Sequence, residues 1–544
     1  MTVVQRADQL ERLADEQFDV AIVGGGITGA GIALDAATRG LRVALVERRD
    51  FAAGTSSRTT KLIHGGLRYL AQGHVGVTRV GSVERSRLLR LAPHLVRPLP
   101  FVVPVTGIAD RLVMSAGLTA YDLVAGFHNV RNHYRLSRGE LAQWFPVLQG
   151  GKYAGGLVYY DGQTDDVRLT VTVIKEALRY DAAIANRCQA IGFGGSARVN
   201  RLLCRDVLSG AELTVRAHRV VLACGVWVDE VLASRPDAQG MLVKPAKGVH
   251  LILPREPFGD RGALLLRHPD DRRYIFVIPW KDRTLVGTTD TAYSGNLAEP
   301  PVTGDDVRYL LRAVRTRLPG AQMTERDVIG VQAGLRPLVN TEKPSTDEVS
   351  REDRVSVSPD GIVTIAGGKL TVYRHMAEKV VDQVVTLLQG DGVRKDRPRC
   401  RTTELALGGF PLGDAGQIAR QELLRSLGER LPADIAAHLL ASYGAAALRI
   451  GELAGSVQEL AERLVEDLPI IMAEARYAVE SELAVSLSDV LTRRLGLTLL
   501  DPKGAVRRAA DVARQIGSLL GWDQPECERQ VSAYRYEAAL HTWG

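Results

Sequence analysis

The chain opens with a pattern that strongly limits how it can fold. Residues 18–23 (FDVAIV) are a compact apolar run, followed by GGGITGAGIALDAATRG and then by LRVALVE. This order predicts a strand, a glycine turn, a helix and a second strand. Gly24, Gly26 and Gly29 occupy the glycine places of GxGxxG, which permit a sharp turn, backbone approach to a pyrophosphate and close helix packing. Glu47 ends the second strand, where a carboxylate can hold ribose hydroxyls, so the pattern predicts a dinucleotide-binding α/β fold.

Two later segments favour a flavin over a nicotinamide, although both dinucleotides use this turn. Residues 218–226 (HRVVLACGV) predict a late strand of the same sheet, ending in a small-residue turn at Gly225. Residues 361–380 predict another strand, a Gly-Gly turn and a helix start, with Gly368 and Thr371 at the turn. A helix N-terminus there can face the flavin pyrimidine, which becomes anionic on reduction. We therefore expect these three residues to contact the cofactor.

Residues 56–70 (SSRTTKLIHGGLRYL) gather hydroxyl, basic and glycine residues in one short segment. Ser56 and Ser57 offer hydroxyls that can bind a pyrophosphate together with neighbouring N–H groups. Lys61 can do the same or lie near flavin N1. Gly65 begins a Gly-Gly pair, which indicates a backbone passing close to the flavin ring, where a Cβ would collide. The first half of the segment is therefore predicted to bind the cofactor.

Length and composition set the class of protein. With 544 residues, 45% hydrophobic and 24% charged, the chain has the balance of a globular protein and room for about three domains. The five cysteines are scattered and include no CxxC, so we expect a reducing environment and no metal site. The formal net charge of +6 suits an anionic substrate or an anionic membrane surface and is too small to indicate nucleic acid.

Five motifs together resemble one family. IVGGGITGAGIALDAATRGL, TSSRTTKLIHGGLRYL, KGVHLILP, GLRPL and GGKLTVYR, in this order, look like the flavin-dependent glycerol-3-phosphate dehydrogenases. The resemblance runs through roughly residues 18–400 and more weakly beyond. It implies FAD as cofactor, oxidation of sn-glycerol 3-phosphate to dihydroxyacetone phosphate, and transfer of electrons to a membrane quinone.

The resemblance also implies the architecture. We expect an α/β fold with a discontinuous, Rossmann-like FAD-binding domain of the glutathione-reductase or D-amino-acid-oxidase type, an antiparallel-sheet substrate domain and a C-terminal α-helical domain. Residues 243–293 indicate successive strands, and helices dominate after residue 400 in a domain suited to packing or to forming a homodimer. The expected boundaries are 18–95, 155–242 and 336–398 for the FAD-binding domain, 96–154 and 243–335 for the substrate domain, and 400–544 for the helical domain.

A phosphorylated alcohol makes three demands: a dianionic phosphate must be held, a hydroxyl must lose its proton, and the C2 hydride must face flavin N5. Arginine suits phosphate because its planar fork binds two oxygens, and lysine adds a point charge. By match to the family motifs, the candidates for binding substrate are Arg68, Tyr69, Arg351 and Lys369. Arg336 in GLRPL lies in an apolar segment, needs a partner there, and can hold the phosphate or stabilise the developing alkoxide.

The catalytic base is expected to be a histidine, whose ordinary pKa is near neutrality. His64 precedes the Gly-Gly pair and His250 lies in KGVHLIL. A structural histidine bonded to backbone is a rival interpretation for each. Asp165, Asp166 and Arg168, in the segment returning to the FAD domain, are expected to cap the next helix.

A dehydrogenase that reduces quinone must reach a bilayer. Residues 98–127 are the most apolar extended region, and their helical part predicts an apolar face made of Leu112, Val113, Ala116, Ala120, Leu123 and Val124. This face is either interfacial or buried in the core. The polar, acidic start of the chain lacks the order of a signal peptide, so we expect a cytoplasmic protein peripherally bound to the inner face of the cell membrane.

Three other functions compete with this interpretation. An oxidase of similar fold would pass electrons to oxygen and produce peroxide, and no residue in the sequence decides between the two acceptors. A nicotinamide-dependent dehydrogenase would share the glycine turn, but the sheet divided along the chain and the HGGLRY motif do not suit it. A flavoprotein without turnover would use the basic cluster only to bind a phosphorylated ligand.

Overall fold

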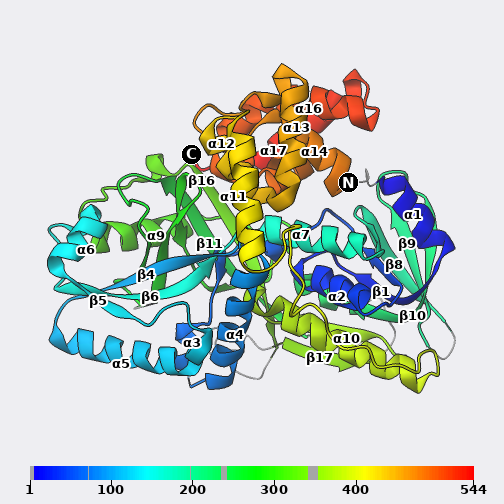
Figure 1. Ribbon diagram of the computed structural model, residues 1–544, viewed down its shortest axis with the longest axis horizontal. Helices are drawn as coiled ribbons and strands as arrows, with labels where there is room; N and C mark the ends of the chain where they lie inside the picture. Colours follow the sequence, from blue (N-terminus) through cyan, green and yellow to red (C-terminus); the bar gives the residue numbers. More distant parts are fainter. Residues whose placement is uncertain (1–4, 72, 196–197, 234–241, 272, 341–352) are drawn as a thin grey trace.

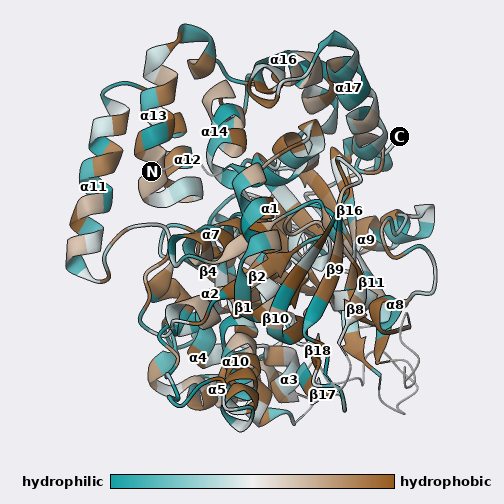
Figure 2. Ribbon diagram, turned by 90° about the vertical axis from the view of Figure 1, so that its right-hand side faces the viewer, coloured by the Kyte–Doolittle hydropathy of each residue, from teal (hydrophilic) through white to brown (hydrophobic). Residues whose placement is uncertain are grey.

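The computed structural model describes residues 5–71, 73–195, 198–233, 242–271, 273–340 and 353–544. Two β-sheets lie side by side, and a helical domain formed by the chain after residue 400 sits over their junction (Figure 1). Hydrophobic residues gather in the strands and in the inner helices (Figure 2). This arrangement confirms the predicted fold class.

The first sheet is mostly parallel and is built from distant parts of the chain. Its order is β17 (Asp353–Val357), β18 (Val363–Gly367), β10 (Glu212–Leu222), β1 (Gln17–Val23), β2 (Val43–Val46) and β7 (Ala183–Ala185), and β9 (Arg201–Asp206) and β8 (Cys188–Gly194) extend antiparallel from β10. The central strand β1 pairs in parallel with β2 and β10. Six of its seven residues are buried, because helices and strands cover both of its faces.

Helices complete the two layers around this sheet. They are α1 (Arg6–Asp15), α2 (Ile27–Thr38), α7 (Asp166–Arg179), α8 (Val228–Ala233) and α10 (Tyr373–Gly390). α2 packs between α7 and α10, and nearly all of its residues are buried. The predicted cap of α7 is confirmed for Asp165, whose side chain accepts a hydrogen bond from the backbone N–H of Arg168.

The second sheet is largely antiparallel, as predicted for the substrate domain. Its order is β15 (Thr291–Ala292), β11 (Val243–Pro254), β14 (Arg283–Gly287), β13 (Tyr274–Trp280), β12 (Ala263–Arg267), β4 (Arg97–Val105), β6 (Gly155–Gln163) and β3 (Leu62–Ile63), with β16 (Gly330–Val339) on β11 and β5 (Tyr134–Ser137) on β6. The accompanying helices are α3 (Leu67–Ala71), α4 (Val75–Leu91), α5 (Ile108–Ala125), α6 (Arg138–Trp144) and α9 (Gly304–Arg317).

The structure moves two of the expected domain boundaries. Residues 155–163 form β6, which pairs with β4 along its whole length and therefore belongs to the second sheet instead of the FAD-binding sheet. Residues 336–339 likewise complete β16, which pairs with β11 from residue 330 to residue 339. After β6 the chain returns to the FAD-binding domain at α7, and after β16 it returns there at β17. A strand stays with the partner that satisfies its backbone hydrogen bonds, and sequence motifs do not reveal that partner.

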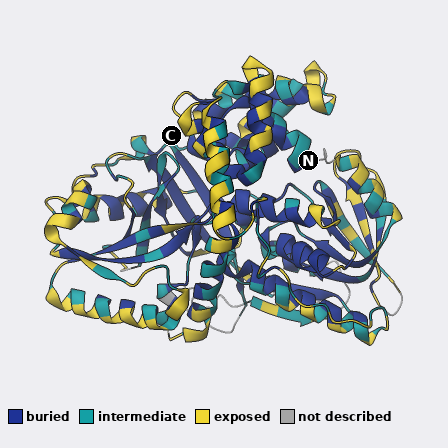
Figure 3. Cartoon of the chain, in the orientation of Figure 1, coloured by how far each residue is buried: buried dark blue, intermediate teal, exposed yellow. Residues whose placement is uncertain are grey.

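The C-terminal domain is helical, as predicted. Its helices are α11 (Asp414–Gly428), α12 (Ala433–Tyr443), α13 (Ala447–Ser456), α14 (Met472–Glu482), α15 (Leu497–Leu500), α16 (Pro502–Leu520) and α17 (Gln524–Ala539). A short π-helical turn, Asp489–Arg494, lies between α14 and α15 and faces the FAD-binding domain. The inner helices bury an apolar core, while α11 is largely exposed (Figure 3).

Helix α5 leaves the predicted apolar face in contact with solvent. Five large apolar side chains of α5 and the turn after it are 59–106% exposed: Ile108, Leu112, Val113, Leu123 and Phe127. The opposite side of α5 packs Leu118 and Tyr121 against the second sheet. The apolar face of this helix is therefore exposed to solvent and is not buried in the core. Among the described residues, no helix combines the length and apolar character needed to cross a bilayer.

A buried cluster of charges joins the helical domain to the first sheet. The Asp50 carboxylate, just after β2, accepts hydrogen bonds from Arg493 Nε at 2.6 Å and from both terminal nitrogens of Arg494 at 2.8 Å. Burial opposes ionisation of Asp50, but the two guanidinium groups outweigh it and hold its pKa well below the ordinary value. Arg168 of α7 forms a second, bidentate pair with Glu482 at 2.8 and 2.7 Å.

We expect Asp50→Asn to destabilise the fold strongly. The variant keeps the shape of the side chain but removes the carboxylate that Arg493 and Arg494 share, and loss of one partner from a buried ion pair costs about 3–5 kcal/mol. Guanidinium chloride unfolding at pH 7, followed by circular dichroism, measures the change. The difference in free energy of unfolding between the unaltered protein and the variant should narrow as the pH falls below the ordinary carboxyl pKa of about 3.9. The stabilisation that comes from the lowered pKa of Asp50 is lost in that range.

The matched control is Asp467→Asn. Asp467 also joins the helical domain to a sheet, through Arg283 at 3.0 Å, but its side chain is 61% exposed. An exposed ion pair contributes about 0–1 kcal/mol, so this variant should unfold almost as the unaltered protein does. Equal effects of the two substitutions would contradict the role assigned to Asp50.

Candidate cofactor and substrate site

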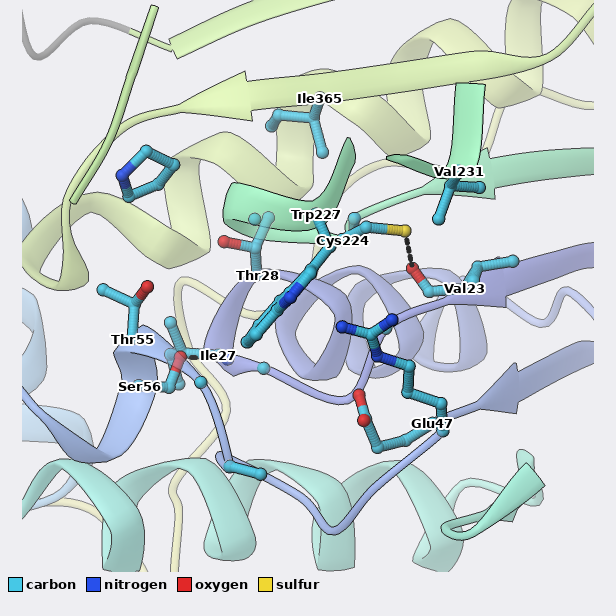
Figure 4. Close-up of a pocket in the computed structure, with 18 of the residues that line it drawn as sticks. Val23, Ile27, Thr28, Glu47, Thr55, Ser56, Cys224, Trp227, Val231 and Ile365 are labelled. Carbon is cyan, nitrogen blue, oxygen red and sulfur yellow. Dashed lines mark hydrogen bonds between the residues drawn. The ribbon is translucent and has the colours of Figure 1, made fainter. Parts of the chain in front are cut away.

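A cavity of about 470 Å³ lies at the carboxyl ends of the parallel strands of the first sheet. Its wall includes Val23, Glu47, Ala223 and Gly367, which stand at the ends of β1, β2, β10 and β18. In open α/β sheets, ligands bind outside this edge. Figure 4 shows the lining residues, with Glu47 on one side and Ile365 on the other.

The glycine turn forms the floor of the cavity, and each glycine has its own structural reason. Gly24 has a φ of +116°, and a Cβ there would lie 2.5 Å from the carbonyl oxygen of Ala223. A Cβ at Gly29 would lie 1.9 Å from the carbonyl oxygen of Gly24, so this glycine packs helix against strand. A Cβ at Gly26 would meet only Ser56 Oγ, at 3.2 Å. Gly26 therefore keeps open the space before the N-terminus of α2.

Two side chains complete this end of the cavity. Ser56 Oγ accepts a hydrogen bond from the backbone N–H of Ile27 at 3.0 Å, which places the hydroxyl at the first turn of α2. The Glu47 carboxylate accepts bonds from the N–H groups of Gly25 and Arg49, both at 2.7 Å. Burial raises the pKa of Glu47, while these two backbone donors lower it. The carboxylate is thus held in a fixed orientation in the cavity wall, as a ribose contact requires.

The opposite wall comes from two later turns, at the positions predicted from the sequence. Gly225 follows β10 with a φ of +56°, and Gly368 follows β18 with a φ of +83°. Both line the cavity, together with Lys369 and Leu370, where a 3-10 turn leads into α10. Thr371 is buried behind this wall, and its hydroxyl accepts a hydrogen bond from the backbone N–H of His64 at 3.0 Å.

Ser57 and Lys61 lie outside this cavity. Ser57 Oγ donates to the carbonyl oxygen of Gly54 at 3.2 Å. The buried Lys61 ammonium donates to Asp166 Oδ1 at 2.6 Å and to the Ser57 carbonyl oxygen at 2.7 Å. Lys61 thus holds the segment to α7, while the Ser57 hydroxyl bonds within its own turn. The contacts of both residues with the cofactor stay a prediction.

Lys369 and Tyr69 come together beside the Gly-Gly pair. The Lys369 ammonium lies 4.9 Å from the centroid of the Tyr69 ring and donates to the Gly65 carbonyl oxygen at 3.3 Å. A Cβ at Gly65 would lie 2.4 Å from the Tyr121 hydroxyl, so packing against α5 already requires a glycine there. The close passage of this backbone along the flavin stays a prediction.

Arg336 projects from β16 next to the cavity wall. Its guanidinium donates to Asp290 Oδ1 at 3.0 Å and to Thr288 Oγ1 at 2.9 Å. The following residue, Pro337, lines the cavity. A cation in this apolar segment was expected to need a partner, because burying an unpaired charge is costly. Asp290 is that partner. The planar group is held in place by two neighbours before any substrate arrives.

His250 is buried on β11 beside Arg336. Its Nε2 lies 3.0 Å from Thr60 Oγ1, and its Nδ1 lies 3.4 Å from Gln332 Nε2. Burial, together with the charges of Arg336 and Lys61, lowers the pKa of His250 to about 3. The imidazole is therefore neutral at physiological pH. His64 is partly buried, and its carbonyl oxygen accepts a long hydrogen bond of 3.5 Å from Lys369.

Two predicted substrate contacts are not placed by these observations. Arg351 lies outside the described residues. Arg68 belongs to α3, but its side chain is likewise outside the description. Their roles stay predictions from the family motifs. Within the parts of the chain that the structure describes, no three His, Cys, Asp or Glu side chains gather as a metal ion would require.

Trp227 is one of the lining residues that the sequence analysis does not predict. Its ring reaches into the cavity from the turn after β10, between Thr28 and the glycine turn in the view of Figure 4. The Arg48 guanidinium lies 4.8 Å from the ring centroid, and a Cβ at Gly54 would lie 2.7 Å from the ring. The available signal was an aromatic residue directly after the predicted small-residue turn of a late strand.

These features fit a flavin dinucleotide. The N-terminus of α2, kept open by Gly26, suits a pyrophosphate, and Glu47 suits the ribose. The wall at Gly368 and Lys369, at the other end, suits the flavin ring. The two ends come from segments more than 300 residues apart in the sequence.

We expect Gly26→Ala to fold normally and to lose FAD. The new methyl group would meet only a hydroxyl, at 3.2 Å, and the φ of −77° suits alanine, so the fold has no reason to change. The methyl group would instead occupy the space that a pyrophosphate needs. The visible flavin absorbance per chain and the thermal midpoint measure the two effects separately.

Gly29→Ala serves as the contrasting variant. Its Cβ would lie 1.9 Å from a backbone carbonyl oxygen, so this substitution should lower the thermal midpoint and with it the yield of folded protein. A Gly26→Ala protein with full flavin content would show that the pyrophosphate does not lie before α2.

Two family models match the chain. Residues 19–374 match the family described as FAD dependent oxidoreductase. Residues 400–527 match the family described as C-terminal domain of alpha-glycerophosphate oxidase. The first match spans both sheets, and the second lies within the helical domain.

Individual relatives resemble the chain over almost its whole length. It is 39% identical to the glycerol-3-phosphate dehydrogenase of Mycobacterium leprae, over 98% of this chain and 91% of that protein. It is 36% identical to the mitochondrial glycerol-3-phosphate dehydrogenase of Homo sapiens, over 95% of this chain and 73% of that protein. The crystal structure of the glycerol-3-phosphate dehydrogenase from Bacillus halodurans, complexed with FAD, has a TM-score of 0.81 at 31% identity and covers 98% of this chain and 97% of its own. The chain thus belongs to the family of FAD-dependent glycerol-3-phosphate dehydrogenases, with FAD as its cofactor.

Proposed function

We propose that this chain oxidises sn-glycerol 3-phosphate to dihydroxyacetone phosphate and passes the electrons to a membrane quinone, acting as a homodimer on the inner face of the cell membrane. The observation that carries the proposal is one continuous cavity. It runs from the dinucleotide turn at Gly24 to Lys369 and Pro337, and Arg336 directly precedes Pro337 in the chain.

The far end suits a phosphorylated alcohol. Lys369, in the turn before α10, lines this end of the cavity, and Arg336 of β16 directly precedes Pro337, which also lines it. A guanidinium binds two phosphate oxygens at once, and an ammonium adds charge at a point. Bound FAD accepts the hydride from C2 of the substrate. Arg336 is also placed to stabilise the negative charge that develops on the substrate oxygen.

His250 is the group that takes the hydroxyl proton in this proposal. His250 lies on β11 and pairs with Gln332 of β16. Gln332 is four residues before Arg336 in the chain. The charge of Arg336 is one cause of the low pKa of His250. A dianionic substrate beside Arg336 offsets that charge, so substrate binding itself raises the basicity of the imidazole. The hydrogen bond with Thr60 fixes the orientation of the ring.

The exposed apolar face of α5 supports contact with a bilayer. It presents Leu112, Val113 and Leu123 to solvent, whereas apolar side chains of this size are usually covered. Arg131 and Arg135 follow in the chain and are exposed, which suits an anionic headgroup layer. An interfacial helix of this kind lies in the plane of the membrane surface.

An anaerobic reduction experiment tests the reaction and the acceptor. Holoenzyme is mixed with glycerol 3-phosphate without oxygen while its visible spectrum is followed, and bleaching of the flavin is expected. An unchanged spectrum would contradict the proposed substrate. A soluble quinone analogue should then restore the oxidised spectrum faster than air does. Rapid recovery in air with equimolar peroxide would instead identify an oxidase.

We expect Arg336→Ala to lose turnover and to retain FAD. Removing a group that stabilises charge in the transition state lowers kcat/KM on the order of a hundredfold or more. The control is Lys244→Ala, which removes an exposed cation from the neighbouring strand, in register with Leu338. Steady-state rates and flavin absorbance are compared for the two variants. Normal rates for Arg336→Ala would show that the substrate binds elsewhere.

A polar α5 face should prevent membrane binding. The triple variant Leu112→Ser, Val113→Ser, Leu123→Ser removes three exposed side chains, each of which contributes about 1.5–3 kcal/mol on insertion. Affinity for vesicles of phosphatidylcholine with anionic phosphatidylglycerol should fall by more than about a hundredfold, because each 1.4 kcal/mol is a factor of ten. Vesicle flotation measures the bound fraction.

The matched control removes exposed apolar side chains from the helical domain, through Ile418→Ser and Leu448→Ser. This variant should bind vesicles as the unaltered protein does, and both variants should reduce their flavin normally with substrate. Equal binding by the two variants would exclude α5 as the membrane contact.

A further inference from the structure

A second, larger cavity of about 660 Å³ lies where the three domains meet. Its wall is formed by the loop after β2, by residues 299–302 of the substrate domain, and by α17 with the residues that follow it. Nothing in the proposed reaction uses this cavity.

Arginine dominates the charged groups in its wall. Five line the cavity, Arg49, Arg58, Arg187, Arg493 and Arg529, against two acids, Glu299 and Glu537. Three of the five already have carboxylate partners. Arg187 pairs with Asp489, Arg493 pairs with Asp50, Asp489 and Glu537, and Arg529 pairs with Glu526.

The remaining two guanidinium groups are not neutralised in this way. Arg49 Nη1 is buried and has no hydrogen-bond partner among the described residues. Arg58 Nη1 donates only to the carbonyl oxygens of Ala298 and Ala333, at long distances of 3.3 and 3.4 Å. No carboxylate of the described part of the chain forms an ion pair with either group. Two half-buried guanidinium groups that no carboxylate of the described residues pairs with directly favour an anion between them.

The lowered pKa values of Arg49 and Arg58 are consistent with an anion site. Burial and the neighbouring charge of Arg49 lower the pKa of Arg58 to about 10. Burial and the charge of Arg493 lower the pKa of Arg49 as well. Desolvation and the neighbouring arginines thus outweigh the nearby carboxylates, which are Glu537 and Glu47 for Arg49 and Glu537 and Glu299 for Arg58. An anion between the two groups would stabilise both cations.

The rest of the wall suits a small organic molecule. Val207, Leu208, Pro301, Leu540 and Trp543 give it an apolar surface next to the arginines. Cavities that bind metabolites have volumes of about 300–1,000 Å³ and combine such a surface with a few fixed polar groups. Arginine pairs suit phosphate because each guanidinium donates to two oxygens.

We propose that this cavity is a second anion site, in which Arg49 and Arg58 bind a phosphate dianion, either free or as the phosphoryl group of a small metabolite. Arg49 also lines the first cavity, whereas Arg58 does not. Arg58 stands between Ser56, at the N-terminus of α2, and Thr60, which contacts His250. The occupant would therefore contact the segment that also places Ser56 in the first cavity and Thr60 against His250.

A crystal of the holoenzyme soaked in tungstate, a phosphate surrogate with a strong anomalous signal, locates the site directly. The expected result is an anomalous peak within hydrogen-bond distance of Arg49 and Arg58. Anomalous peaks confined to the first cavity or to the surface would overturn the proposal. This measurement needs no variant, so it stays decisive if a substitution prevents folding.

Calorimetric titration tests the same site in solution. Holoenzyme, Arg58→Gln and the control Arg425→Gln, which removes an exposed arginine of α11, are titrated with inorganic phosphate and with glucose 6-phosphate. Arg58→Gln should keep its flavin and bind one or both probes about tenfold to a hundredfold more weakly, as expected for the loss of one charge-assisted contact. Arg425→Gln should bind like the unaltered protein.

The two probes identify the source of the phosphate group. Tighter Arg58-dependent binding of glucose 6-phosphate indicates a phosphorylated metabolite, and tighter binding of inorganic phosphate indicates the free ion. Equal affinities of Arg58→Gln and the unaltered protein for both probes, or no binding by the unaltered protein, would overturn the proposal.

Discussion

The buried carboxylate of Asp50 is the contact on which the arrangement of the domains depends. It lies three residues after Glu47, so the strand that presents the ribose contact leads directly into the contact with the helical domain. Arg493 and Arg494 reach it from more than 440 residues away in the chain. A charge this deeply buried is stable only while its partners are in place. The helical domain therefore holds the cofactor loop in position without itself lining the first cavity.

Residues 56–70 connect the parts of the site that this arrangement brings together. Ser56 caps α2 beside the first cavity, Arg58 lines the second, and Thr60 orients His250. Lys61 then anchors the segment to α7. The hydroxyl and basic residues that are dense in the sequence are thus divided among four neighbours. A single anion-binding patch would have been the simpler interpretation, but the described contacts of Lys61 are with Asp166 and the Ser57 carbonyl oxygen.

The parts of the fold that follow from local rules were predictable from the sequence. The glycine turn, the Gly-Gly turn at residue 368 and the helical character beyond residue 400 depend on neighbours within a few residues. The assignment of β6 to the second sheet, the position of Trp227 and the partners of Asp50 depend on contacts between distant segments. Residue type restricts such contacts but does not identify the partner. The motifs therefore located the site, while Trp227 in its wall and the partners of Asp50 became known only from the structure.

The pairing of β18 with β10 has a consequence for synthesis of the protein. Val221 and Leu222 pair with Val363 and Thr364, so the first sheet stays incomplete until the ribosome has released the chain beyond residue 367. Until then the carboxyl end of β10 lacks its partner, although β9 already pairs with residues 212–216, and the cavity lacks the wall at Gly368. Unpaired edges of this kind associate with other chains. The nascent protein is therefore most exposed to aggregation during translation of the substrate domain, and the wall at Gly368 can form only after about two thirds of the chain has been made.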